Sequence, residues 1–442
     1  MNNIKDMTKG RPSRLMLYFS MPLLLANVLQ LFYVMADSAI VGRMLGVSAF
    51  AAVGASAGIY FLASSVVNSI AHGFGMVFAQ RFGAKDAIGL SKAFVTAIYL
   101  MLMLSIVIGL IGVFGSEFLL RLLNTPSELL PGGAVYLSWL LGGMAITAIY
   151  QLIFSMLLAL GDSKTVMRAI ILVSVLNVAF ALALVTPLEI AGPAIALLLA
   201  QLIGLAYCLY ILRQTKVFAN NSFRWDAIYA KELLRVGVPL GLKDSIIQLS
   251  GLVVQRYINN FGVEFIAGIA IAKRMYSLLF LAGGAFEAAA AAFSAQNFGA
   301  NNLKRVRQGL KTGTWLMLTA AFITMPLTLI FGRFILGLMF DGDPYQINTV
   351  LDIGMRQLTV LTLALPIVYM LFLCKATLEG MGKSFISMLS GFLEAASRLA
   401  WVLLLTPSAG EWGILLADPI GWVAAAALLI AAYYVLRRRE FK

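Results

Sequence analysis

Long apolar runs alternate with short polar loops along almost the whole chain. A helix needs about 20 apolar residues to cross a bilayer, and most of the runs reach that length. The pattern predicts six transmembrane helices, a polar segment at residues 214–234, and six more helices. The expected spans lie near residues 15–40, 48–79, 92–114, 131–159, 165–187 and 191–213, and then near 235–261, 265–295, 310–332, 350–379, 385–406 and 411–436.

The two sets of helices resemble copies of one unit. The segment AQRFGA at 79–84 returns 216 residues later as AQNFGA at 295–300, and Gly46-Val47 returns as Gly262-Val263 at the same offset. An even number of helices per copy gives both copies one orientation, related by a pseudo-two-fold axis along the membrane normal. We expect an all-α integral membrane fold with an N-terminal lobe at 1–213, a cytoplasmic linker at 214–234 and a C-terminal lobe at 235–442.

Composition and charge placement narrow the function classes. Hydrophobic residues form 61% of the 442 residues and charged residues only 12%, about half the charged share of soluble domains, which excludes a soluble enzyme. The net charge of +13 does not indicate nucleic-acid binding, because the bases sit in alternate short loops. Examples are Arg81, Lys85 and Lys92, then Lys304 and Arg305, then Arg437 and Arg438. The positive-inside rule then predicts that both termini are cytoplasmic.

Other sequence signals add little chemistry. Cys208 and Cys374 both lie inside apolar runs, which suggests neither a disulfide nor a metal site. The first apolar run contains Asn27 and Asp37 and is long, so we interpret it as a retained helix rather than a signal peptide. No phosphate-binding Gly-rich motif is present, and we expect no cofactor.

Several motifs together resemble those of the multidrug and toxin extrusion (MATE) family. The first-helix segment DSAIVGR at 37–43, followed by AAVG at 51–54, is similar to the signature of that family. AQRFGAKD at 79–86, its repeat at 295–302 and LGDSKT at 160–165 resemble its cytoplasmic loops. The resemblance implies twelve helices in two bundles with a V-shaped architecture. It also implies export of organic, often cationic, compounds in exchange for H⁺ or Na⁺.

Two positions depart from patterns seen in the family. Many bacterial members resemble one another in having an acidic residue four positions after an asparagine in helix 5, but here Asn177 is followed by Ala181. The NorM branch has a glutamate eight residues after the helix-7 proline, whereas Pro239 here leads to Ile247. These departures leave Asp37 as the carried-over ion position. The resemblance is to the DinF-like side of the family more than to NorM.

Intramembrane ionisable residues are the candidates for ion coupling, because a charge at membrane depth costs roughly 2.5–3.5 kcal/mol on insertion scales. Asp37 continues a polar stripe with Gln30 and Tyr33, and Glu287 interrupts a run of alanine and glycine. We predict both carboxylates as coupling sites for H⁺ or Na⁺, with no other metal. A structural carboxylate beside Arg43, and a pair between Glu287 and Lys273 or Arg274, are the alternatives.

Further polar residues are candidates for the wall of a substrate cavity. Glu394 and Arg398 are four residues apart and share a helix face, so they can pair. Lys375 and Glu379 have the same spacing, and Lys243 and Asp244 are adjacent. The predicted cavity residues are Gln30, Tyr33, Asn68, Gln151, Asn177, Gln248, Gln255, Glu394 and Arg398. Interhelical hydrogen bonding is the alternative for the amides.

The sequence predicts a secondary transporter in a bacterial cytoplasmic membrane, acting as a monomer on small molecules, with the lipid bilayer as its other partner. The main alternative is a flippase for lipid-linked precursors or polysaccharides, which would need a cationic cavity. Lys243, Arg256, Lys273, Arg274, Lys375 and Arg398 keep that alternative open. A non-transporting scaffold and a membrane enzyme fit less well.

Overall fold

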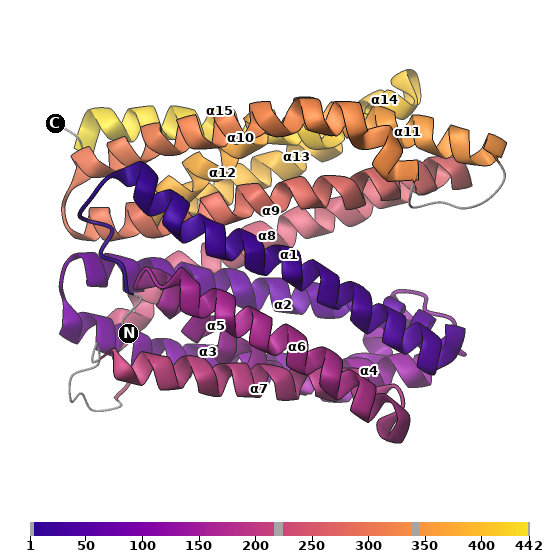
Figure 1. The fold of residues 1–442 in the computed structure, drawn as a ribbon, viewed down its shortest axis with the longest axis horizontal. Coiled ribbons are helices and arrows are strands. Elements are labelled where there is room, and N and C mark those ends of the chain that lie inside the picture. Colours follow the sequence, from indigo (N-terminus) through magenta and orange to yellow (C-terminus); the bar gives the residue numbers. More distant parts are fainter. Residues whose placement is uncertain (1–3, 216–223, 338–343, 441–442) are drawn as a thin grey trace. The chain divides into compact units, whose positions relative to one another are not determined.

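The computed structural model describes residues 4–215, 224–337 and 344–440, which form helices joined by short loops, with no strand among them (Figure 1). Residues 216–223 of the expected linker lie outside this part. The chain divides into two compact units, Met1–Lys9 with Tyr18–Gly241 and Gly10–Leu17 with Leu242–Lys442. We call them the N-terminal unit and the C-terminal unit.

The N-terminal unit is built on one long central helix. Its helices are α1 (Pro12–Met44), α2 (Gly46–Gly83), α3 (Ala87–Leu122), α4 (Leu130–Gly142), α5 (Met144–Ala159), α6 (Ser163–Leu188) and α7 (Ala191–Gln214). The first residues of α1, through Leu17, are counted with the C-terminal unit. The α2 helix packs against α3, α4 and α5, and α7 packs against α4, α5 and α6.

The C-terminal unit repeats this plan around α9. Its elements are α8 (Ala227–Ile258), a short 3₁₀ turn (Asn259–Phe261), α9 (Val263–Gly299), α10 (Leu303–Gly337), α11 (Pro344–Leu363), α12 (Leu365–Gly380), α13 (Ser384–Ala409), α14 (Glu411–Leu415) and α15 (Ala417–Glu440). The α9 helix packs against α10, α11 and α12, and α15 packs against α12 and α13. The boundary between the units falls inside α8, whose first half belongs to the N-terminal unit.

The loop that follows each central helix has the same geometry in both units. Lys85 and Asn301, 216 residues apart, adopt left-handed backbone with φ of 59° and 54°. The next residue in each copy, Asp86 or Asn302, accepts the backbone N–H three positions later at 2.8 or 3.1 Å. This is N-capping, which satisfies a free amide at a helix start. The sequence repeat is therefore also a structural repeat.

Two expected spans are bent rather than straight. The prediction of one helix over 131–159 is wrong in detail, because α4 and α5 meet at 45° across Gly143. The span at 350–379 is likewise bent by 47° between α11 and α12. Pro366 in the first turn of α12 has no N–H to continue the backbone hydrogen bonds of α11. At the other bend, the adjacent Gly142 and Gly143 weaken the end of α4. The last span is also interrupted, at Leu416.

The number of membrane crossings agrees with the sequence prediction. Among the described residues, nine helices are long and apolar enough to span a bilayer, and counting each bent pair as one span gives eleven. The α8 helix is not among them, but its 32 residues are long enough for a twelfth crossing, and like α1 it contains an internal proline. The predicted twelve-helix, all-α membrane fold is confirmed.

Candidate functional site

The carboxylate of Asp37 lies in a group of tyrosines inside the N-terminal unit. Its Oδ1 atom is buried and accepts no hydrogen bond from any described residue. Tyr33, one turn earlier on α1, and Tyr136 of α4 interact electrostatically with it. Tyr60 of α2 lies close to both of these tyrosines. We call Tyr33, Asp37, Tyr60 and Tyr136 the Asp37 cluster.

A second layer of hydrogen bonds holds this cluster in place. The Thr147 hydroxyl of α5 donates to Oε1 of Gln201 of α7 at 2.7 Å, and both side chains are buried. The Tyr60 hydroxyl bonds to these same two side chains, and Gln30 bonds to the Tyr33 hydroxyl. Five helices therefore position the oxygens around one carboxylate. A buried carboxylate oxygen without a hydrogen bond is stabilised by gaining a proton or a small cation.

The other predicted polar residues of the N-terminal unit differ in their surroundings. Asn177 on α6 is 1% exposed, and its Oδ1 has no partner among the described residues. Asn68 is exposed and Gln151 is half-buried, and neither hydrogen-bonds to the Asp37 cluster in the part of the chain that the structure describes. Asn68 and Gln151 are therefore not tied to the Asp37 cluster by hydrogen bonds among the described residues, and Asn177 has a second buried oxygen that lacks a donor.

The C-terminal unit contains ion pairs instead. Arg398 donates to Oε1 of Glu394 at 2.7 Å and to the Ser250 hydroxyl at 2.8 Å, and its Nε lies 3.0 Å from Oδ1 of Asp418. Glu394 and Arg398 are 7% and 5% exposed, so this pair is buried. The predicted pair between them is formed, and the structure adds Asp418 of α15 as a second acidic partner.

Lys375 and Glu379 do not pair with each other, contrary to the expectation from their spacing. Lys375 lies 2.7 Å from Oε1 of Glu287, which also rules out pairing of Glu287 within its own helix. Glu379, which is 1% exposed, accepts from Lys243 at 2.9 Å and from Ser387. Contacts across helices therefore replace the local pair. The Lys243 ammonium also lies 3.6 Å from the Asp244 carboxylate, so these adjacent side chains converge rather than diverge.

The remaining predicted residues of the C-terminal unit have peripheral positions. Gln248 is half-buried, and Gln255 is exposed and donates to Asn259 at 2.9 Å. Arg256, Lys273 and Arg274 are also exposed. The charged residues of the interior are therefore Lys243, Asp244, Glu287, Lys375, Glu379, Glu394, Arg398 and Asp418, which we call the C-terminal ion-pair network.

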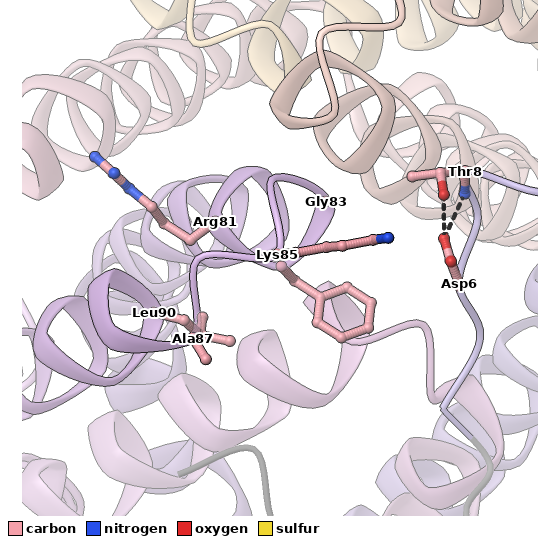
Figure 2. A pocket seen from close by; sticks show the side chains of 8 residues that line it. Asp6, Thr8, Arg81, Gly83, Lys85, Ala87 and Leu90 are labelled. Atoms are coloured by element: carbon pink, nitrogen blue, oxygen red, sulfur yellow. Dashed lines mark hydrogen bonds between the residues drawn. The ribbon is translucent and has the colours of Figure 1, made fainter. Parts of the chain in front are cut away.

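A pocket of about 280 Å³ lies elsewhere, at the end of α2 (Figure 2). Asp6, Thr8, Arg81, Phe82, Gly83, Lys85, Ala87 and Leu90 line it. In Figure 2 the Lys85 side chain extends toward Asp6 and Thr8, while Arg81 points away. Arg81 is instead paired with Asp86 at 3.1 Å and Glu232 at 2.7 Å. The residues that line the pocket include no member of the Asp37 cluster. The pocket therefore belongs to the loop between α2 and α3, which is N-capped by Asp86.

Comparison with known proteins identifies the chain. A family model described as MatE matches residues 22–183 and 239–399, one segment in each repeat. The chain belongs to the MATE family. It is 31% identical over 306 residues to the probable multidrug resistance protein YpnP of Bacillus subtilis, covering 68% of each chain. It is 29% identical to the probable multidrug resistance protein YoeA of the same organism, covering 75% of this chain and 74% of that one.

Solved structures show the same fold. A MOP superfamily transporter from Pyrococcus furiosus superimposes with a TM-score of 0.89 at 20% identity, covering 99% of this chain and 98% of that one. The protein is therefore a multi-pass membrane transporter with a MATE fold. The placement on the DinF-like side of the family stays a prediction.

Sequence reasoning missed several residues at both sites. Tyr60, Tyr136 and Thr147 look like ordinary apolar-helix residues, because only the packing of several helices brings their hydroxyls together. Asp418 could have been found by the rule that identified Asp37, since it is an acidic residue at the start of an apolar helix.

Proposed function

We propose that this protein exports small organic cations in exchange for H⁺ or Na⁺, and that the inward-moving ion binds at Asp37. The observation that carries the proposal is the buried, unpaired Oδ1 of Asp37 among tyrosine oxygens. Membership of the MATE family supports transport, and relatives named as probable multidrug resistance proteins support organic compounds as substrates.

Alternating access follows from how the two ligands bias the conformations. Occupancy of Asp37 by a cation removes the free energy penalty of a buried charge, and favours the states in which the Asp37 cluster is closed around it. Substrate binding favours the states that release the ion. Each ligand shifts the equilibrium only by its difference in affinity between the two states, so exchange needs no other energy source.

The available driving force is adequate for this exchange. One positive charge moving inward down 100 mV releases about 2.3 kcal/mol. At about 1.4 kcal/mol per factor of ten, that supports roughly a 50-fold gradient of a neutral substrate. A monovalent organic cation exchanged for one ion gains nothing from voltage and depends on the concentration gradient of the ion.

The charges of the C-terminal unit favour a cationic substrate over the phosphate groups that a flippase would bind. Lys243, Lys375 and Arg398 each have a carboxylate within 3 Å. These three interior cations are therefore already paired with carboxylates, which leaves little of their positive charge available to a lipid phosphate.

We also propose a monomer in the bacterial cytoplasmic membrane with both termini on the cytoplasmic side. The concentration of bases in alternate loops supports this orientation. In that orientation the inward gradient of H⁺ or Na⁺ drives export.

The proposal is tested by efflux of a fluorescent organic cation from proteoliposomes under separately imposed H⁺ and Na⁺ gradients. Native protein should transport under one gradient, which names the ion. Asp37→Asn should lose gradient-driven transport, because an amide neither binds a proton nor balances a cation. Glu117→Gln is the matched control, since Glu117 is an exposed carboxylate of the same unit whose salt bridge among the described residues is with Arg121 at the surface.

Gradient-driven transport that survives Asp37→Asn would move coupling to another carboxylate, such as Glu287. Absence of dye transport under both gradients, together with lipid scrambling by the native protein, would favour the flippase alternative.

A further inference from the structure

The pairing of Lys375 with Glu287 has the chemistry of a bound organic cation. The Lys375 ammonium lies 2.7 Å from Oε1 of Glu287 and 4.9 Å from the centre of the Phe372 ring. A carboxylate and an aromatic face are the two groups that bind ammonium ions in proteins. The lysine is also 17% exposed and the glutamate 19%, more than either member of the Lys243–Glu379 pair or the Glu394–Arg398 pair.

Room for a ligand exists on the same face of α9. Phe280, Gly284 and Glu287 are spaced by four and three residues and therefore share one face. A Cβ placed on Gly284 would meet no atom within 4 Å, whereas one on Gly283 would lie 2.9 Å from Tyr369. Open space thus adjoins Glu287 on the side toward Phe280.

An aromatic row continues from the ion pair. The Phe372 and Phe280 rings meet edge to face at 5.3 Å, and Phe280 in turn contacts Trp422 at 5.9 Å. Tyr276 stacks on Trp422 at 5.8 Å with an interplanar angle of 17°. These residues come from α9, α12 and α15 of one unit. Phe280 and Phe372 are half-buried and can contact a flat aromatic group attached to a cation, while the buried Tyr276 and Trp422 support Phe280 from behind.

The lysine has another carboxylate to pair with if it leaves Glu287. Lys375 interacts electrostatically with Glu394. Arg398, the partner of Glu394, also lies 3.0 Å from Asp418, so Glu394 can accept a second cation without leaving Arg398 unpaired.

We propose that Lys375 is a tethered competitor in an aromatic-cation site formed by Glu287 and Phe372, and that a substrate cation displaces it. The inference rests on the proposed function and names its substrate class, aromatic monocations. In the empty site Lys375 neutralises Glu287. In the occupied site the substrate ammonium takes that position and Lys375 moves toward Glu394.

Equilibrium binding of ethidium to the purified protein, followed by fluorescence polarisation, tests this without any ion gradient. If the lysine occupies Glu287 for about nine-tenths of the time, its removal in Lys375→Gln lowers the Kd about tenfold. Glu287→Gln should raise the Kd at least as much. Lys273→Gln is the matched control, because it removes an exposed lysine from α9 and should leave the Kd unchanged.

Lys375→Arg keeps both the charge and the pair, and provides a variant with an opposite expected effect. A guanidinium binds a carboxylate through two parallel hydrogen bonds, so it competes more strongly and should raise the Kd roughly threefold or more. An unchanged or higher Kd in Lys375→Gln would overturn the inference. If Lys375→Gln does not fold, an unchanged or lower Kd in Lys375→Arg would overturn it instead.

The two proposals fail in different measurements. Loss of gradient coupling in proteoliposomes concerns Asp37 and leaves ethidium binding intact. A change in the ethidium Kd of the Lys375 variants opposite to the expected direction would exclude the proposed role of Lys375. It would not affect the prediction of gradient-driven efflux.

Discussion

Buried carboxylates have opposite surroundings in the two units. Asp37 is surrounded by tyrosine oxygens, and no basic side chain pairs with it in the described residues. Glu394 is held by Arg398 at 2.7 Å. A carboxylate without a fixed counter-charge can exchange ions during a cycle, whereas one in a buried pair is held in a single geometry. We therefore propose that Asp37 serves ion coupling and that Glu394 serves to fix the structure.

The Arg398 pair should therefore be important for stability. Arg398→Met removes the partner of Glu394 and Asp418 at once, and should lower the free energy of unfolding by about 3–5 kcal/mol. Denaturation of the purified protein in mild detergent measures this loss.

Glu394→Gln is the comparison variant, because Arg398 keeps Asp418 at 3.0 Å and Ser250 at 2.8 Å. It should lose less stability than Arg398→Met. Equal losses would show that Asp418 does not contribute to holding the arginine.

Ion pairs within one helix turn were partly predictable, and those between helices were not. The spacing of Glu394 and Arg398 predicted their pair, and the structure contains it. The same spacing predicted a pair between Lys375 and Glu379, but stronger partners on α9 and α8 were available. Which helices become neighbours depends on tertiary packing, which a local pattern does not contain.

At the scale of elements, glycine sets how closely α2 and α8 approach within the N-terminal unit. A Cβ on Gly73 of α2 would lie only 2.7 Å from the Cα of Gly237 of α8. Small residues allow backbones to pack closely where apolar side chains give no preference over lipid. This contact fixes the first half of α8 against the helix that carries Tyr60.

Gly73→Ala should therefore destabilise the protein and lower its melting temperature, although alanine is intrinsically the better helix former by about 1 kcal/mol. The control is Gly54→Ala on the same helix, where a Cβ would meet nothing within 4 Å. Its melting temperature should stay the same or rise. A Gly73→Ala protein as stable as Gly54→Ala would contradict the close packing.

Helix existence was predictable from apolar run length, but helix continuity was not. Each of the expected spans at 131–159 and 350–379 is a bent pair, and the bends of 45° and 47° occupy equivalent places in the two repeats. Hydropathy averages over a whole run and therefore does not detect a break at a single residue such as Gly143.

At the scale of the whole molecule, one duplicated plan carries two different kinds of chemistry. The repeated loop geometry at Lys85 and Asn301 shows the common plan. The Asp37 cluster and the C-terminal ion-pair network show the divergence. Length, repeat and charge placement predicted the fold, and the role of Asp37 stays a prediction from its place in an apolar helix. The polar stripe on α1 included Tyr33, but the sequence did not predict Tyr60 and Tyr136 beside Asp37, because they come from other helices.

The central claim is that Asp37 couples ion entry to substrate exit, rather than only binding substrate. The most direct measurement compares two activities of Asp37→Asn in the same proteoliposomes: gradient-driven uphill dye efflux and downhill exchange of dye for dye. Our account predicts that uphill efflux is lost while dye exchange continues, because the neutral amide permits the conformational change without an ion. Uphill efflux at the native rate in the Asp37→Asn protein would contradict it.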